Sequence, residues 1–476
     1  MGFVAPEFGP ALTEIVLAAG ICIVMLADLF LSTRIRGITL LLSLVTLATA
    51  AWFSGAAEGS VLTFSGSYVA DPLAKVLKLF TLLIVGVVFV YSDGYLRERG
   101  LLKGEYYLIG LFATLGMLVM ISANSLITMY LGLELMSLAL YSMAAFDRES
   151  PVAAESAMKY FVLGAIASGV LLYGMSLLYG VTGTLQLDEI AVSLAAGEAQ
   201  RPVVLLALTF MLVGVAFKFG AVPFHNWVPD VYHGVPTSVT LFIGTAPKMA
   251  AFAMLARLFH TGLAPEALAW QPMLAVLATL SLILGNVVAI AQTNIKRMLA
   301  YSTIAHVGFI LLGFAAGTAA GRQAALFYTL VYAVMAAAAF GLIILMSRRG
   351  FEADELDDFR GLNQRSPWFA VMMLFIMASM IGIPPFVGFF AKLHVLTALV
   401  GASQTWLAVL AVLFSVIGAY YYLRVIRLMY FDEPVDKARL AAGFDLRLLL
   451  SANALMVLLL GVFAEPLLLI CGAAIN

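Results

Sequence analysis

The sequence contains only two cysteines, Cys22 and Cys471, among its 476 residues. They lie alone in apolar runs near opposite ends of the chain, which indicates neither a disulfide framework nor a cysteine metal site. A GxxxxGK[ST] phosphate loop, a CxxC pair and the residue order of a Ser/His triad are also missing. We therefore expect no chemistry on a bound organic substrate within this chain.

Charged residues are scarce as well. They make up 11% of the chain, against about 25% in a typical soluble protein, while apolar residues make up 63% and the mean hydropathy is +1.04. Only helices or closed barrels satisfy their backbone polar groups in lipid. The alternation of apolar and polar residues that marks barrel strands is absent. The composition therefore predicts an all-α polytopic membrane protein.

Apolar runs long enough to cross a bilayer predict about fourteen transmembrane helices. Their expected ranges are 11–30, 38–56, 73–92, 105–122, 124–146, 152–180, 203–222, 238–260, 267–290, 298–317, 324–346, 368–398, 405–430 and 448–471. We divide the chain into an N-terminal three-helix segment (1–104), a first repeat (105–260), a second repeat (261–430) and a C-terminal loop with helix 14 (431–476).

Lysine and arginine are distributed unevenly over the connections between these helices. Alternate connections, counted from the first, carry 17 of them: Arg34, Arg36, Arg97, Arg99, Lys103, Arg148, Lys296, Arg297, Arg348, Arg349, Arg360, Arg365, Arg424, Arg427, Lys437, Arg439 and Arg447. The opposite connections carry 5: Lys75, Lys78, Arg201, Arg257 and Arg322. Because cytoplasmic loops retain positive charge, we expect both termini to lie on the periplasmic side. The bacterial inner membrane is the location that the family resemblance described below implies.

Five ionisable residues fall inside the expected spans: Glu134 in "MYLGLELMSLALYSMAAF", then Lys159, Lys218, Lys248 and Lys392. A charge at the bilayer centre costs roughly 2.5–3.5 kcal/mol on insertion scales. A single lysine could extend its ammonium to the interface, but five such residues predict a buried chain of ionisable groups. A lysine whose charged partner moves by a few ångströms can gain or release a proton. Such a chain is therefore suited to carrying protons.

Two spans are interrupted by proline. "FGAVPFHNWVPDVYHGVP" follows Lys218, and "MIGIPPFVGFF" precedes Lys392. Irregular backbone at membrane depth persists only where it is buried in protein or lines a polar cavity, and matching breaks in two halves indicate an inverted-repeat transporter. We expect helices 4–8 and 9–13 to form two inverted five-helix repeats, with helices 7 and 12 broken and Lys218 and Lys392 related by the repeat. The alternative is that the prolines only bend two helices.

Histidines add further polar positions. His306 lies within helix 10, the expected counterpart of the helix that carries Glu134, and the alternative interpretation is a hydrogen-bonded core histidine. His225 follows the break after Lys218 and could connect it to the cytoplasmic side. Tyr422, in a run of three tyrosines, is interpreted as an interfacial or packing aromatic.

Five stretches together resemble the antiporter-like membrane subunits of respiratory complex I, the NADH:quinone oxidoreductase. They are "GLELMSLALY", "ESAMKYFVLGAIASG", "FKFGAVPFHNWVPDVYHGVPTSVT", "NIKRMLAYSTIAHVGFILLG" and "GIPPFVGFFAKLHV". Within that family the chain is similar to the N-type subunits, because it reads "PDVYHGVPT", has Lys392 where M-type subunits have glutamate, and ends soon after helix 14.

This resemblance implies a role for each buried group. Glu134 would pair with Lys218, Lys248 would connect it to Lys392 as the terminal lysine, and Lys159 would be a further lysine on helix 6. Quinone reduction elsewhere in the complex would drive the proton relay. No cofactor is expected on this chain, since NADH, FMN, the iron–sulfur clusters and quinone would bind other subunits.

The implied partners are K-type and M-type neighbours, the lateral helix of the L-type subunit, lipid and protons, with no nucleic acid. Two other classes of function stay open at this point. One is a D-type subunit of a multisubunit Na⁺/H⁺ antiporter, which shares the fold and the buried residues. The other is a structural scaffold in which the buried charges only join helices.

Overall fold

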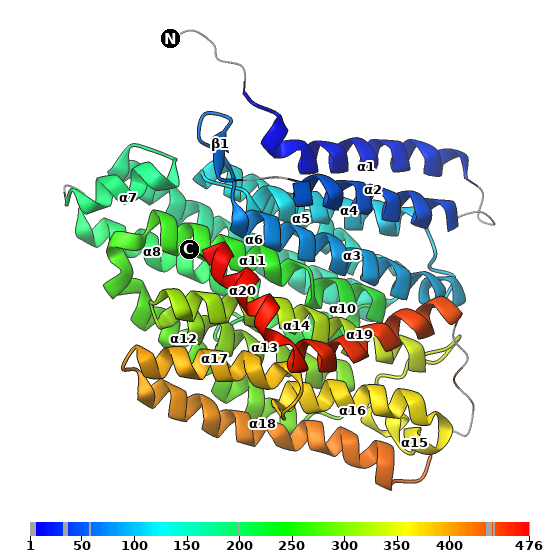
Figure 1. Ribbon diagram of the computed structural model, residues 1–476. Coiled ribbons are helices and arrows are strands. Elements are labelled where there is room, and N and C mark those ends of the chain that lie inside the picture. The colour runs from blue at the N-terminus through cyan, green and yellow to red at the C-terminus, as the bar shows by residue number, and fades with distance from the viewer. Residues whose placement is uncertain are drawn as a thin grey trace.

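The computed structural model describes residues 6–31, 37–56, 59–197, 200–434, 440 and 443–475. The long helices run side by side in one bundle, and short connections join them at its two ends (Figure 1). Four residues of the charge argument, Arg34, Arg36, Lys437 and Arg439, lie outside the described residues.

The first described part consists of three long helices and a small hairpin. Their bounds are η1 Gly9–Ala11, α1 Leu12–Phe30, α2 Gly37–Ala56, β1 Val61–Thr63, β2 Tyr68–Ala70 and α3 Pro72–Glu98. The two strands are antiparallel. The Asp71 side chain accepts a hydrogen bond of 2.8 Å from the Ala74 N–H, so an N-cap and a following proline begin α3.

The first repeat follows. Its elements are α4 Gly104–Ile121, α5 Leu126–Ala144, α6 Pro151–Thr182, α7 Leu187–Ala195, α8 Arg201–Phe219, α9 Trp227–Gly234, α10 Thr237–Gly244, α11 Pro247–Leu255 and η3 Ala256–Gly262. Ser150 caps α6 by accepting from the Ala153 N–H at 3.2 Å, and Pro151 occupies its first turn.

The second repeat and the last helices complete the bundle. Their elements are η4 Ala264–Glu266, α12 Ala267–Ile290, α13 Ile295–Ala315, α14 Ala319–Met346, η5 Leu356–Phe359, α15 Leu362–Arg365, α16 Pro367–Ile381, α17 Val387–Gly401, α18 Thr405–Phe431, α19 Phe444–Val462 and α20 Ala464–Ile475.

Within the described residues, 13 helical segments are long and apolar enough to cross a membrane. The twelfth expected span, 368–398, is divided between the shorter helices α16 and α17. The all-α polytopic fold and the breaks after Lys218 and before Lys392 are therefore confirmed. The expected span 238–260 is found within the single candidate span Thr237–Gly262, in which a short interruption at Thr245 and Ala246 separates α10 from α11.

The two repeats contain the same backbone joint. The Leu126 N–H donates to the Leu185 carbonyl at 3.0 Å where α5 begins, and the Ile295 N–H donates to the Asp354 carbonyl at 2.6 Å where α13 begins. The first joint holds the start of α5 against the segment that follows α6, and the second holds the start of α13 against the segment that follows α14. The two joints lie at opposite ends of the bundle (Figure 1). The second repeat therefore has the inverted orientation, as five spans per repeat require. The residue boundaries that we assign to the repeats stay a prediction.

The centre of the bundle is formed by α10, α11, α13 and α14. The most apolar windows of Thr237–Gly262 and Ala319–Met346 are 100% buried, whereas that of the first helix is 33% buried. A helix that is apolar all round belongs in a protein interior. The central helices therefore provide the protein-enclosed surroundings in which polar groups can lie at membrane depth.

Candidate functional site

Lys218 lies in the last turn of α8, directly before the first break. Its ammonium donates a hydrogen bond of 2.8 Å to the Ser137 hydroxyl and lies 3.5 Å from the Tyr141 hydroxyl, both on α5. Glu134, one turn before Ser137, accepts a hydrogen bond from the Ser168 hydroxyl on α6. The carboxylate influences Lys218 electrostatically, but in the described part of the chain no direct ion pair joins them. Lys218 therefore contacts α5 one turn after Glu134, through the Ser137 hydroxyl, which itself donates to the Leu133 carbonyl.

Lys248 lies in the first turn of α11 and is 1% exposed. Its ammonium donates a hydrogen bond of 2.8 Å to the Phe219 carbonyl, which the break after α8 leaves without a helical partner. The ammonium also lies 5.8 Å from the centre of the Trp227 ring, within the range of a cation–π contact. The position next to the break connects Lys248 with the end of the helix that carries Lys218.

His306 lies on α13 among tyrosines. One ring nitrogen, Nδ1, is 2.7 Å from the Tyr328 hydroxyl, and Nε2 is 3.1 Å from the Tyr422 hydroxyl. Tyr422 is in turn 2.5 Å from the Ser302 hydroxyl. Each hydroxyl can both donate and accept a hydrogen bond, so this cluster can pass a proton through His306 in either direction.

Lys392 lies on α17 beyond the second break. Its ammonium donates to the Met380 carbonyl at 3.0 Å, the Ile381 carbonyl at 2.7 Å and the Ser415 hydroxyl at 2.8 Å. Lys392 and His306 line one small cavity, which has room for about one water molecule. A single water can therefore connect the histidine cluster with the terminal lysine.

The structure corrects the interpretation of Lys159. Its side chain is 44% exposed in this chain and forms ion pairs with Glu155 at 2.9 Å and Asp230 at 3.0 Å. Lys159 is therefore not part of the buried set. The reason is its position near the start of α6, where the helix lies at the protein surface and an acid on α9 is within reach.

Two further expectations also change. His225 is buried in the segment between α8 and α9, and its Nδ1 has no hydrogen-bond partner within the described residues. No contact places it between Lys218 and the far side of the bundle. The matching residues of the two breaks are the glycines Gly220 and Gly382, which align Lys218 with Met380 and not with Lys392.

Several polar groups of the interior were not predicted from the sequence. Tyr422 is fully enclosed and bonded to His306, whereas its neighbour Tyr420 is 58% exposed. Lys78, which the charge argument places in a loop, is buried and forms an ion pair of 2.6 Å with Glu14. The hydroxyl of Tyr68 accepts from Lys78 at 2.7 Å and donates to Glu14 at 2.8 Å.

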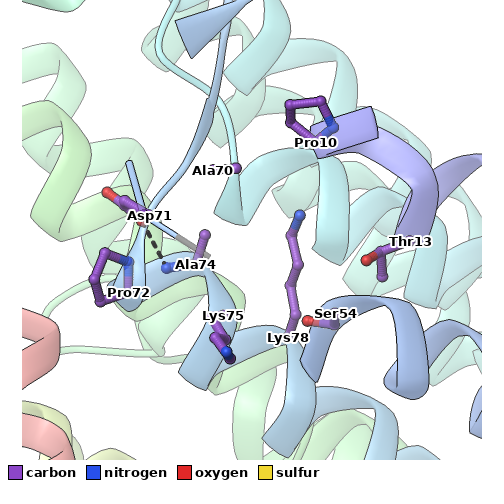
Figure 2. Close-up of a pocket in the computed structure, with 10 residues that line it drawn as sticks. Pro10, Thr13, Ser54, Ala70, Asp71, Pro72, Ala74, Lys75 and Lys78 are labelled. Carbon is purple, nitrogen blue, oxygen red and sulfur yellow. Dashed lines mark hydrogen bonds between the residues drawn. The ribbon is translucent and has the colours of Figure 1, made fainter. Parts of the chain in front are cut away.

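This second charged cluster borders an open cavity at the end of the bundle where α3 begins (Figure 2). Figure 2 shows Lys78 extending from α3 toward Pro10 and Thr13. At the cavity wall, Arg257 forms a bidentate pair of 2.6 and 2.7 Å with Asp71. Burial alone would raise the pKa of Asp71, but the hydrogen bonds and charge of Arg257 outweigh it and hold the pKa below its usual value.

The described residues contain no group of three or more His, Cys, Asp or Glu side chains arranged to hold a metal ion. The groups that the structure places at and between the two breaks are instead lysines, a histidine, hydroxyls and the Glu134 carboxylate. These groups can hold or transfer protons.

Comparison with known proteins identifies the class. The family model described as "NADH:quinone oxidoreductase/Mrp antiporter, TM" matches residues 123–418, which include both breaks and all the buried groups from Glu134 to Lys392. The fold and the site are thus those of an antiporter-like membrane subunit. NADH-quinone oxidoreductase subunit N of Thioalkalivibrio sulfidiphilus is 56% identical over 479 residues, which cover 100% of both chains. The chain therefore belongs to the NADH-quinone oxidoreductase subunit N family.

Solved structures agree with this assignment. A chain of respiratory complex I from Thermus thermophilus with bound aureothin is 33% identical, covers 97% of this chain and 100% of that chain, and has a TM-score of 0.82. A chain of the Mrp complex from Dietzia is 23% identical and has a TM-score of 0.85, with 98% of this chain and 97% of that chain covered. The second likeness shows the fold alone, so the antiporter alternative shares the architecture without the sequence identity.

Proposed function

We propose that this chain is a proton-translocating subunit in the membrane arm of a bacterial NADH:quinone oxidoreductase. The observation that carries the proposal is the set of ammonium and imidazole groups held at the two helix breaks and between them. The order of the relay is Lys218, Lys248, the His306 cluster and Lys392. Quinone reduction on other subunits supplies the energy, and NADH, FMN and iron–sulfur clusters also belong to those subunits.

In this proposal Glu134 adjusts the proton affinity of Lys218, the first lysine of the relay. Its carboxylate favours the protonated form of Lys218 when the two groups approach, and Ser137, one turn after Glu134 on α5, holds the ammonium near this part of the helix. The half-buried Glu134 lies on the same face of α5 as the exposed Leu131 and Leu138. We assign this face to a neighbouring membrane subunit, with K-type and M-type subunits and the lateral helix of the L-type subunit as the partners. Both termini are periplasmic in the bacterial inner membrane.

Lys218→Ala tests the proposed function, with Arg201→Ala as the matched control because it removes an exposed cation from the other end of the same helix. NADH oxidation and proton uptake are measured in inner-membrane vesicles, and assembly is checked on native gels. We expect the Lys218→Ala complex to assemble and to lose pumping by at least about tenfold, since groups that transfer protons contribute roughly 10²–10⁴-fold. Intact pumping in that variant would favour the scaffold interpretation.

The Na⁺/H⁺ antiporter alternative has a separate test in the same vesicles. A respiratory subunit requires NADH for proton uptake, whereas an antiporter moves protons when a Na⁺ gradient is applied without NADH. We expect the Lys218→Ala defect to appear only in the NADH-driven measurement.

A further inference from the structure

A carboxylate from the connection between α14 and α16 enters the bundle at the end that holds the C-terminus of α3. The Tyr95 hydroxyl lies 3.0 Å from each of the two carboxylate oxygens of Glu352 and donates a hydrogen bond that they share. Glu352 also pairs with Arg99 and accepts from the Thr237 hydroxyl at the start of α10. Sequence analysis assigns no role to this acid, which lies in a loop of mixed charge.

Glu352 has solvent on one side. It is one wall of an open cavity whose other charged residues come from three connections of the bundle, namely Glu98, Arg99, Asp147, Glu149 and Arg349. Its own side chain is 25% exposed. Water in this cavity can therefore reach the carboxylate directly, and the acids on the walls keep the local concentration of cations, including protons, high.

On the inner side of Glu352 lies a buried lysine that the relay proposed above does not use. Lys296, in the first turn of α13, is 3% exposed, and its ammonium donates to the Val235 carbonyl at 3.1 Å. The Val235 carbonyl lies two residues before Thr237, whose hydroxyl donates to Glu352, so the same stretch of chain contacts both side chains. Arg99, which pairs with Glu352, and Asp354, whose carbonyl accepts from the Ile295 N–H at 2.6 Å, are the other charged residues here. A buried ammonium this near a solvent-accessible carboxylate can exchange a proton with it through a bridging water.

Two fully buried hydroxyls continue inward from this pair. Ser238, next to Thr237, and Tyr232, on α9, have hydroxyls without a hydrogen-bond partner among the described residues. The Tyr232 ring packs edge-on against Phe340 on α14, the helix that also carries Tyr328 and Tyr332, two ring neighbours of His306. Buried polar groups are normally paired with protein or water, so these hydroxyls can bind water between Lys296 and the His306 cluster.

We propose that Glu352 and Lys296 form the port through which the relay takes up protons from the solvent at this end of the bundle. The proposal rests on the proposed function and adds the place where protons enter. Lys296 passes a proton inward and becomes a neutral amine. The protonated carboxyl of Glu352 then returns a proton to Lys296, and the carboxylate is reloaded from water in the cavity. The cycle transfers protons only and leaves both side chains unchanged.

Glu352→Gln tests the port. Asp357→Asn is the matched control, because it removes one negative charge from an exposed position of the same loop. NADH-driven proton uptake is measured from pH 6 to pH 9, a range of about three units chosen to span neutrality. Without a collecting carboxylate, proton uptake limits turnover most where free protons are scarce. We expect Glu352→Gln to lose activity at a pH about one unit lower than wild type, and Asp357→Asn to follow the wild-type profile.

Glu352→Asp separates proton uptake from a purely structural role. The shorter side chain contacts Thr237 and Tyr95 less well than glutamine does, but it keeps a titratable carboxyl. We expect Asp to restore the wild-type pH profile at least in part, while Gln does not. A lower yield of assembled complex with an unchanged pH profile in Glu352→Gln would overturn the port and leave only an ion pair that fixes α10.

The Lys218→Ala result distinguishes this proposal from the one on which it rests. If Lys218→Ala abolishes pumping while Glu352→Gln keeps the wild-type profile, the relay stands and protons enter elsewhere. If both variants pump normally, the proposed function itself is wrong.

Discussion

The break after α8 and the break after α16 have matching backbones. Gly220 and Gly382 both adopt the left-handed conformation, with φ of 74° and 93°. The N–H of the next residue donates to the carbonyl five residues earlier in both cases, from Ala221 at 2.8 Å and from Ile383 at 3.0 Å. This is the hydrogen bond of a Schellman motif. The two repeats therefore end their broken helices in the same way.

The same carbonyl at each break accepts a hydrogen bond from a lysine. It is the carbonyl directly before the glycine: Lys248 donates to Phe219 at 2.8 Å, and Lys392 donates to Ile381 at 2.7 Å. The C-terminal end of a helix carries partial negative charge and stabilises a nearby cation. Each break thus provides an acceptor carbonyl for an ammonium group in the interior, and we call this position the seat of the break.

The difference between the breaks lies in which helix provides the lysine. In the second repeat Lys392 follows its own break on α17, whereas in the first repeat Lys248 comes from the next span. The position that matches Lys392 carries Asp230, and the position that matches Lys218 carries Met380. The first repeat therefore provides two ammonium groups, those of Lys218 and Lys248. The second provides one ammonium group, that of Lys392, and the imidazole of His306. The two breaks therefore share a backbone but carry different ionisable side chains.

The largest effect that tests this comparison is expected from Lys392→Met. Methionine keeps the length of the side chain and removes the ammonium from the second seat. We expect NADH-driven proton uptake to fall at least about tenfold in assembled complexes. Arg427→Met, which removes an exposed cation from α18, serves as the control. Normal pumping in Lys392→Met would show that the two seats have different roles.

A smaller effect is expected from Tyr422→Phe. The variant removes the hydroxyl that joins His306 to Ser302 and leaves the ring in place. We expect a loss of pumping of roughly threefold to tenfold, since loss of one hydrogen bond of about 0.5–1.5 kcal/mol changes the population of a productive geometry by that order. Tyr420→Phe on the exposed side of the same helix should match wild type. Equal proton pumping in the two variants would show that the Tyr422 hydroxyl has no role in the relay.

Alanine at either glycine tests whether the shared backbone is needed. A non-glycine residue in the left-handed conformation costs about 1–2 kcal/mol. The added Cβ would also lie 2.4 Å from the Val228 side chain at Gly220 but 3.0 Å from the Lys392 side chain at Gly382. We expect Gly220→Ala to lower the thermal stability of the complex more than Gly382→Ala does.

Gly401→Ala serves as the control for both glycine variants, because no atom lies within 4 Å of the added Cβ there. Equal stability of all three alanine variants and wild type would contradict the need for a left-handed residue at the breaks.

The smallest effect is expected from Asp230→Asn. Burial would raise the pKa of Asp230, but the ion pairs with Lys159 and Arg297 hold it below its usual value of 3.8. A lowered pKa stabilises the folded protein above pH 3.8, and this stabilisation is lost as the pH falls through the folded-state pKa. We expect the variant to lose about 1 kcal/mol near neutral pH, measured by thermal unfolding. A difference from wild type that does not narrow on acidification would contradict the ion-pair explanation.

The sequence was sufficient for the parts of the fold that depend on local pattern. Apolar run lengths predict the spans, and the proline clusters predict both breaks. The break at Thr245 was missed, because "TAPK" offers a single proline inside an otherwise continuous apolar run. Proline is common in the first turn of a helix, but its presence here does not show that another helix ends just before it.

The candidate site was less predictable, because burial depends on contacts between distant segments. Tyr420 and Tyr422 are equivalent in a helix that is apolar on all sides, yet only Tyr422 faces His306. Lys296 reads as a loop cation, but the start of α13 is covered by the connection that carries Glu352. Lys78 and Glu14 pair from separate helices, and no sequence period signals such a pair.

We propose that the ammonium groups held at the helix breaks carry protons, and Lys248→Met is the sharpest test of this role. Methionine fills most of the space of the lysine side chain, so the complex should assemble. Proton uptake per NADH oxidised is then measured in vesicles, together with the rate of NADH oxidation. We expect proton uptake to fall at least about tenfold. Unchanged proton uptake and NADH oxidation in the assembled Lys248→Met complex would contradict it.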